Sequence, residues 1–202
     1  MTLTAHTPLQ IVPKALAAID PASALARAKY AYSTRFVEEA AKNGEFDLSY
    51  DLLQAPKPGD VVLARVVEIG QHKRLESPVS RRQMLFEGDE IVVAYGSRYA
   101  ADQFLSLIPT DLGPCHLAAA GGLASRVLDQ HHRMDDATVI EPIGLLVNRD
   151  GARVNLRDYA PHSVTNSSDD RTAANQHGNP TVISVLGTSM NSGKSTTLAC
   201  LA

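Results

Sequence analysis

Short runs of β-branched residues, each entered through a glycine-containing turn, constrain the fold of this chain most. Val61–Ile69 follows the turn Lys57-Pro58-Gly59-Asp60, and Ile91–Tyr95 follows Glu87-Gly88-Asp89. β-Branched residues favour extended backbone, whereas Gly and Asp favour the turn that precedes it. We therefore expect a β-strand at both places.

A tight hairpin and several shorter strands are expected in the same region. Leu145–Asn148 and Ala152–Leu156 flank Arg149-Asp150-Gly151, and Asp-Gly permits the positive backbone angles of a tight turn. Short antiparallel strands at this spacing are typical of a small β-barrel or sandwich. The further strand candidates are Arg81–Phe86, Cys115–Ala119 and Thr138–Glu141, and the candidate for a short helix is Ala101–Leu107.

An amphipathic helix is expected near the N-terminus. Asp20-Pro21 suits a helix start, with Asp as the cap and Pro in the first turn, and Asn43-Gly44 suits its end. Apolar residues recur at three- and four-residue steps between them, at Leu25, Ala28, Tyr32, Phe36 and Ala40. This spacing predicts one helix over residues 21–42, packed against a core.

The chain then divides into segments of different character. Between Pro161 and Asn179 the only large apolar residue is Val164, which indicates a flexible linker. We expect a helical segment over residues 1–55, a small β domain over 56–160, the linker over 161–180, and a new domain from residue 181. The predicted fold class is α+β.

The last residues contain a glycine-rich loop between an apolar segment and a helix-compatible one. Thr181–Leu186 is the expected strand, Thr197–Ala202 the expected helix, and between them the chain reads Gly187-Thr188-Ser189-Met190-Asn191-Ser192-Gly193-Lys194-Ser195-Thr196. Such a loop aims backbone N–H groups at a ligand from the positive end of a helix dipole. The pattern predicts a phosphate-binding P-loop.

Each residue type in this loop has a chemical reason. Gly187 allows a tight exit from the strand, and Gly193 lets the backbone approach the phosphates. Lys194 bridges the β and γ phosphates, Ser195 places its hydroxyl on Mg²⁺, and Thr196 reaches the helix N-terminus or an α-phosphate oxygen. The predicted ligand is therefore ATP or GTP with Mg²⁺, held by residues 187–196.

The spacing differs by one residue from the common Gly-x-x-x-x-Gly-Lys-[Ser/Thr] form, because Thr188 stands where that form has its first Gly. The variant resembles the loop of the dethiobiotin synthetase-like branch of P-loop proteins, through Gly187, Thr188, Gly193, Lys194 and Ser195. Members include ATP-dependent amide- and ring-forming ligases. The resemblance covers residues 181–202 and implies a P-loop NTPase or a ligase- or kinase-like protein, with the substrate open. The β domain resembles uncharacterised bacterial proteins with a barrel before such a loop.

A P-loop domain also needs a parallel sheet and a second acidic residue that holds Mg²⁺ through water. The residues after the linker supply one strand and one short helix, and no such acid is identified. We therefore expect the chain to be a fragment of a longer protein, inactive in triphosphate hydrolysis by itself. No catalytic residue is predicted.

Three other groupings have a functional and a structural interpretation, and the structural one is favoured for each. Cys115-His116 suggests a nucleophile and base, but neighbours in a strand face opposite ways. His131-His132 suggests a metal site, but adjacent side chains diverge and the stretch is polar. Gly121-Gly122 suggests a tight loop where backbone approaches a ligand or another strand, but a packing or bulge role is favoured.

The alternative function is a binding module. The β domain would then recognise a protein or nucleic-acid partner, and the P-loop would be incomplete and inactive. His72-Lys73-Arg74 and Arg81-Arg82 flank one strand pair, but the net charge is -3 and aromatic residues make up 5% of the chain, which weighs against nucleic acid. Two distant cysteines and the lack of a long apolar segment favour a cytoplasmic protein without a membrane partner.

Overall fold

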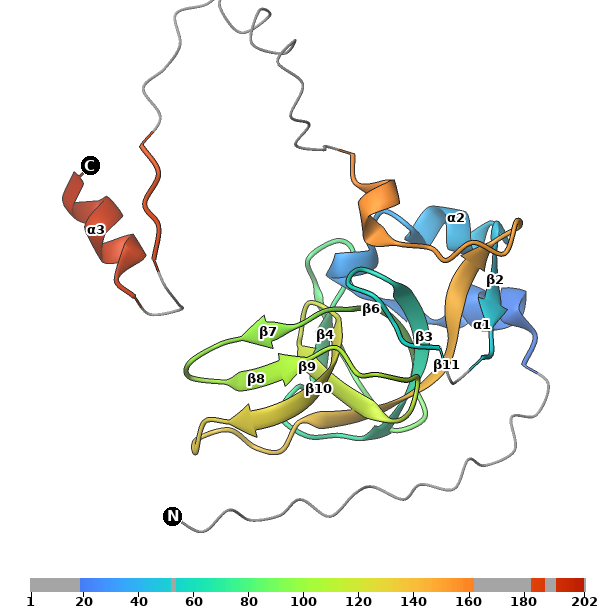
Figure 1. The fold of residues 1–202 in the computed structure, drawn as a ribbon, viewed down its shortest axis with the longest axis horizontal. Coiled ribbons are helices and arrows are strands. Elements are labelled where there is room, and N and C mark those ends of the chain that lie inside the picture. The colour runs from blue at the N-terminus through green and yellow to red at the C-terminus, as the bar shows by residue number, and fades with distance from the viewer. Residues whose placement is uncertain (1–18, 52–53, 162–182, 188–191, 202) are drawn as a thin grey trace, which may run out of the picture.

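A large β-sheet dominates the structure, a computed structural model that describes residues 19–51, 54–161, 183–187 and 192–201. Figure 1 shows this nine-stranded sheet with a separate two-stranded sheet and short helices, which confirms the α+β class. The elements are α1 (Pro21–Arg27), β1 (Lys29–Tyr30), the 3-10 helix η1 (Tyr32–Thr34), α2 (Glu38–Lys42), β2 (Phe46–Ser49), β3 (Val61–Glu68), β4 (Arg74–Glu76), β5 (Arg82–Met84), β6 (Glu90–Tyr95), β7 (Arg98–Tyr99), β8 (Phe104–Leu107), β9 (Cys115–Ala119), β10 (Leu123–Gln130), β11 (Thr138–Asn148), the 3-10 helix η2 (Leu156–Tyr159) and α3 (Lys194–Leu201).

Part of the large sheet closes on itself through strand pairing. The order is β1-β6-β3-β11-β9-β10-β8-β7, and β2 pairs with β11 beside this path. β10 also pairs in parallel with β6, through Leu123 opposite Ala94 and Ala124 opposite Tyr95. The five strands β6, β3, β11, β9 and β10 therefore form a closed circuit of hydrogen-bonded neighbours.

Alternation along the strands separates two hydrophobic cores, one on each face of the sheet. In β3, Val62, Ala64 and Val66 belong to one core, whereas Val61 and Leu63 belong to the other. Successive side chains of a strand point to opposite faces, so a strand buried on both faces reads as a continuous apolar run. This explains why the β3 sequence is almost wholly apolar.

The second core is covered by the N-terminal elements. Leu25 of α1, Ala41 of α2 and Phe46 of β2 pack in the same cluster as Leu63 and Leu146 of the sheet. Fully burying one leucine or phenylalanine side chain stabilises a fold by about 1.5–3 kcal/mol. The segment before residue 51 is thus attached to the sheet through apolar packing as well as through the pairings of β1 and β2.

The single helix expected over residues 21–42 was wrong, because the chain leaves the helix after Arg27. The predicted start and end are confirmed: Asp20 accepts a hydrogen bond from Ser23 N at 3.2 Å, and Gly44 follows α2 with a φ of +73°. Between them β1 pairs with β6, and Tyr30 is 2% exposed with its hydroxyl donating to the Leu25 carbonyl at 2.9 Å. Pairing and burial of Tyr30 outweigh the helical spacing.

The strands at Val61–Ile69, Ile91–Tyr95, Arg81–Phe86 and Cys115–Ala119 are confirmed in place, with small shifts of their ends. The strands expected at Thr138–Glu141 and Leu145–Asn148 are one continuous strand, β11. The short helix at Ala101–Leu107 was wrong, since Phe104–Leu107 is strand β8, with Phe104 and Ser106 buried and Leu105 and Leu107 exposed. The hairpin turn at Gly151 forms, but its returning arm makes only isolated bridges, Val147 to Arg153 and Asp60 to Asn155. Of the expected linker, residues 162–180 lie outside the described part of the chain.

Candidate functional site

The described part of the predicted P-loop is a glycine turn leading into a helix. Gly193 has a φ of +81°, in the left-handed region that favours glycine. Helix α3 starts at the next residue, and Thr197 N donates to the Gly193 carbonyl at 2.9 Å. The helix therefore begins three residues earlier than the expected Thr197–Ala202.

Gly187, the first residue of the loop, lies close to Ser192 and Lys194 at the other end of the loop. A Cβ atom at Gly187 would lie 2.0 Å from Ser192 Oγ and 2.9 Å from Lys194 Cγ. Contacts this short are not tolerated, so a larger residue at position 187 would require the side chains of Ser192 and Lys194 to move. Gly187 and Gly193 are separated by five residues in the sequence, and the two ends of this segment approach each other closely.

The predicted ligand residues are placed as follows. Lys194 is half-buried, and its Nζ lies 3.2 Å from Ser192 Oγ within the loop. Ser195 and Thr196 lie exposed in the first turn of α3. The structure therefore brings together Gly187, Ser192 and Lys194, whereas Thr188, Ser189, Met190 and Asn191 lie outside the described residues.

The strand expected at Thr181–Leu186 is not formed over its described residues. Residues 183–187 carry no strand assignment, and Ile183 and Leu186 are 69% and 88% exposed. A strand is defined by hydrogen bonds to a neighbour, and no described residue pairs with this segment. The apolar composition that predicted the strand is present, but within the described residues no strand pairs with it.

Cys115 and His116 are held on opposite faces of β9. Cys115 is buried, and burial raises the pKa of its thiol to about 12. His116 Nδ1 accepts a hydrogen bond from Val127 N at 3.1 Å. The pair is therefore not arranged as a nucleophile and base, and Cys115 lies in the first hydrophobic core.

The other groupings also have structural explanations. The rings of His131 and His132 lie side by side, with centroids 4.2 Å apart, which differs from the expected divergence. Among the described residues, no group of three or more His, Cys, Asp or Glu side chains is placed to hold a metal ion. Gly122 has a φ of +97°, and a Cβ there would lie 2.1 Å from Ala31 Cβ, so this glycine serves close packing.

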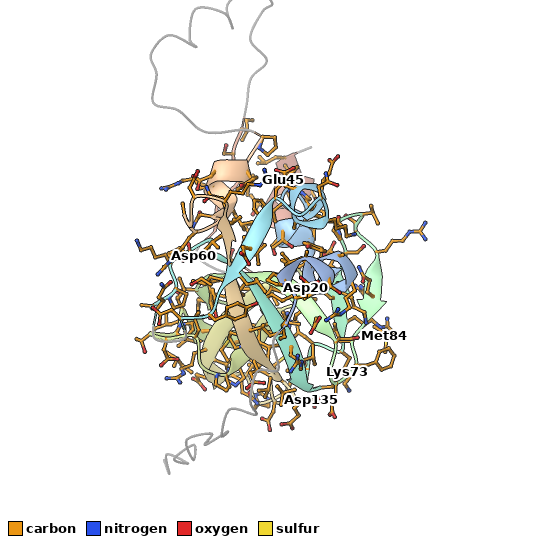
Figure 2. All side chains as sticks on the ribbon, turned by 90° about the vertical axis from the view of Figure 1, so that its right-hand side faces the viewer. Asp20, Glu45, Asp60, Lys73, Met84 and Asp135 are labelled. Atoms are coloured by element: carbon orange, nitrogen blue, oxygen red, sulfur yellow. The ribbon has the colours of Figure 1, made fainter. Side chains whose placement is uncertain are left out.

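A surface groove was not predicted from the sequence. It has a volume of about 530 Å³ and lies between the start of α1, strand β2 and the turn after β11. Figure 2 shows Asp20 and Glu45 on this side of the molecule. Its polar lining residues are Asp20, Glu45, Asp47, Asn148 and Arg149. They come from three separate segments of the chain, so no local sequence pattern indicates the groove.

Comparisons with known proteins add no relative. A scan against protein-family models, a search of curated proteins and a search of solved structures each gave no match to this chain. In the described residues no helix combines the length and apolar character needed to cross a membrane. The geometry and the sequence of the chain itself are therefore the basis of its proposed function.

Proposed function

We propose that the chain binds a nucleoside triphosphate with Mg²⁺ through the loop of residues 187–196. The observation that carries the proposal is the close approach of Gly187 to Ser192 and Lys194, directly before the start of α3. In P-loops, backbone N–H groups at a helix N-terminus bind phosphate oxygens. The phosphate chain is the ligand that this arrangement suits.

The proposed roles follow from the position of each side chain. Lys194 supplies a positive charge at the β and γ phosphates, and Gly193 lets the backbone come close to them. Ser195 is the proposed Mg²⁺ ligand, since its hydroxyl follows the lysine in the first turn of α3. Thr196 is adjacent and is proposed to contact the α-phosphate. The proposed reaction class is that of P-loop NTPases and ATP-dependent ligases or kinases, by resemblance.

We also propose that the closed circuit of strands is a small β-barrel. Its support is the pairing of β10 with both β9 and β6, together with a core composed of alternate residues from these strands. Barrels remove exposed strand edges by closure. In this proposal the barrel precedes the nucleotide-binding segment as a separate unit.

Saturation-transfer NMR on ATP protons, with Mg²⁺ and the full chain, tests nucleotide binding. Because the expected site lies on a small, exposed segment, we expect a weak complex, with a Kd of about 1 mM, and no turnover. Lys194→Ala should abolish the transfer, and inorganic pyrophosphate should compete for it. If GTP competes as strongly as ATP binds, the site does not distinguish adenine from guanine. If GTP competes weakly, the site prefers ATP.

A matched control keeps the test specific to the loop. Lys57→Ala removes the same charge from an exposed position in the β domain and should leave the transfer unchanged. Equal transfer in wild type and Lys194→Ala would refute the proposal. Equal loss in both variants would show that only net charge matters, and would refute it as well.

A further inference from the structure

Cations and exposed aromatic rings lie on two adjoining segments outside the proposed phosphate-binding loop. We call their surface the basic–aromatic surface and define it by Arg35, Phe36, Arg74, Arg81, Arg82 and Phe86. These residues come from the segment after η1 and from the β4–β5 hairpin with the turn that follows it. The two aromatic side chains are 46% exposed at Phe36 and 62% exposed at Phe86.

Hydrogen bonds attach the two segments to the same turn. Ser33 N donates to the Gly121 carbonyl at 3.0 Å, and Glu76 N donates to the neighbouring Ala120 carbonyl at 2.8 Å. On the other side Lys29 Nζ donates to the Met84 carbonyl at 2.9 Å. The β4–β5 hairpin is therefore attached at both strands to elements that adjoin η1.

The hairpin carries an unbalanced positive charge. Residues 73–84 contain four cations and one carboxylate, a net charge of +3 in a chain whose total is -3. In the part of the chain that the structure describes, Arg81 and Arg82 form no salt bridge. Of the nearby carboxylates, Asp89 and Glu90 are paired with Lys29, Arg27 and Arg65, whereas Glu76 stands opposite Arg82 in the hairpin. Lys73 is paired with Asp135 at 3.9 Å, so the hairpin cations of the proposed surface are Arg74, Arg81 and Arg82. Figure 2 shows Lys73 and Met84 together at one edge of the molecule, where Leu85 N also donates to the Lys73 carbonyl.

Each exposed ring is accompanied by a cation. The Arg35 guanidinium carbon lies 4.1 Å from the Tyr32 ring centroid and 4.3 Å from that of Phe36. Lys29 Nζ lies 5.4 Å from the Phe86 centroid. Cation–π contacts of this kind fix a ring at the surface while part of it stays accessible to solvent.

We propose that the basic–aromatic surface binds single-stranded nucleic acid. Such a strand alternates a negative phosphate with a flat base, and a surface that binds it combines a cationic track with rings on which bases stack. Arg74, Arg81 and Arg82 would contact phosphates, while Phe36 and Phe86 would stack on bases. An acidic peptide would satisfy the cations without using the rings.

The positions of the rings and cations matter more for nucleic-acid binding than the overall composition of the chain does. A low aromatic content and a negative net charge argue against nucleic acid only if the few rings and cations are scattered. Here the rings lie on segments that adjoin Arg81 and Arg82, which form no salt bridge among the described residues, and two of the nearby carboxylates, Asp89 and Glu90, are paired with other cations. Local charge, rather than total charge, determines attraction of a phosphate backbone at physiological salt.

Fluorescence anisotropy of a labelled oligo(dT) of about 15 nucleotides, titrated with the full chain at about 50 mM salt, tests the proposal. Phe86→Ala should weaken binding at least about fivefold, since stacking one base contributes about 1–3 kcal/mol. Arg81→Gln/Arg82→Gln should also weaken binding at least about fivefold, because two contacts to phosphates are lost. Arg149→Gln/Arg157→Gln is the matched charge control and Tyr99→Ala the matched aromatic control. Both should bind as wild type does, because these exposed residues lie on other elements.

The possible results divide clearly. Binding that falls with salt and is lost in the first two variants, with both controls intact, supports the proposal. Absence of oligonucleotide binding overturns it, as does equal loss in the controls. Tighter binding to poly-glutamate, or to vesicles containing anionic phospholipid, than to the oligonucleotide also overturns it, in favour of an acidic protein or a membrane surface. Circular dichroism of each variant confirms that the fold is retained.

Discussion

Replacement of Asp60 should cost this fold more than replacement of any exposed acid. Asp60 is 2% exposed, directly before β3, and its position is labelled in Figure 2. Its Oδ2 accepts from Lys57 N at 2.9 Å and from Arg153 Nη1 at 3.1 Å, and its Oδ1 accepts from Asn155 Nδ2 at 3.0 Å. One carboxylate thus joins the turn before β3 to the segment after β11.

The magnitude follows from what the partners lose. Removing one member of a buried ion pair costs about 3–5 kcal/mol because the other charge stays without compensation. Arg153 is 28% exposed at its side chain and keeps the Ala55 carbonyl and Gln54 Oε1 as acceptors, so the lower end applies. We expect Asp60→Ala to lower the free energy of unfolding by about 3 kcal/mol and Tm by about 6–12 °C.

Urea denaturation followed by circular dichroism measures this loss, since the chain has no tryptophan. Asp158→Asn is the control: its salt bridge to Arg157 is long, 3.9 Å, and exposed, so the change should be within about 0.5 kcal/mol. A loss below about 1 kcal/mol in Asp60→Ala would refute the reasoning, because the carboxylate would then not be the joint between the two segments.

Three further predictions concern packing and titration. Gly122→Ala should lower the free energy of unfolding by at least about 2 kcal/mol, since the added methyl overlaps a neighbour at positive φ, whereas Gly121→Ala, in open space, should be neutral. Burial, and then the charge of Arg98, lowers the pKa of His72 to about 4. As the pH is lowered, the unfolded chain therefore binds a proton at His72 before the folded chain does. The free energy of unfolding should fall as the pH is lowered from about 6.5 to about 4, by about 1–2 kcal/mol more than in His72→Gln. In a thiol-reagent assay exposed Cys200 should react at once and Cys115 only after unfolding; simultaneous reaction would contradict the buried placement.

The strands were predictable where local chemistry sets them. Gly59 and Gly88 have φ values of +84° and +88°, as the turns before β3 and β6 required. By contrast β10 was missed, because it mixes buried Ala124 and Ser125 with exposed Arg126 and Leu128 and shows no regular alternation. A register shift between Val127 and Asp129 breaks the period further. Such a strand is recognisable only once its partners are known.

The helix error has a tertiary cause. Leu25 and Ala28 are buried as the apolar stripe predicted, but Phe36 is 46% exposed because the chain has left the helix by then. The pairing of Lys29 and Tyr30 with Ile91 and Val92 is a contact between distant segments, which helical periodicity does not encode. The same holds for β8, where alternating Phe, Leu, Ser and Leu conceal two different faces.

The two candidate sites differ in the same way. The proposed phosphate-binding loop is continuous in sequence, so its residues are predictable from the sequence alone. The basic–aromatic surface combines Arg35 and Phe36 with residues 74–86, and the Ala120–Gly122 turn joins them. A sequence pattern identifies the cations of the hairpin, but their proximity to exposed rings comes from the fold.

The amide resonance of Gly193 tests nucleotide binding most directly, because its N–H is proposed to meet the phosphates. In a ¹⁵N-labelled chain titrated with Mg²⁺–ATP, we predict saturable shifts of the Gly193 and Lys194 amides that vanish in Lys194→Ala and persist in Lys57→Ala. Shifts elsewhere should be small. Unmoved Gly193 and Lys194 amides, or identical shifts in Lys194→Ala, would contradict the proposal that this loop binds phosphate.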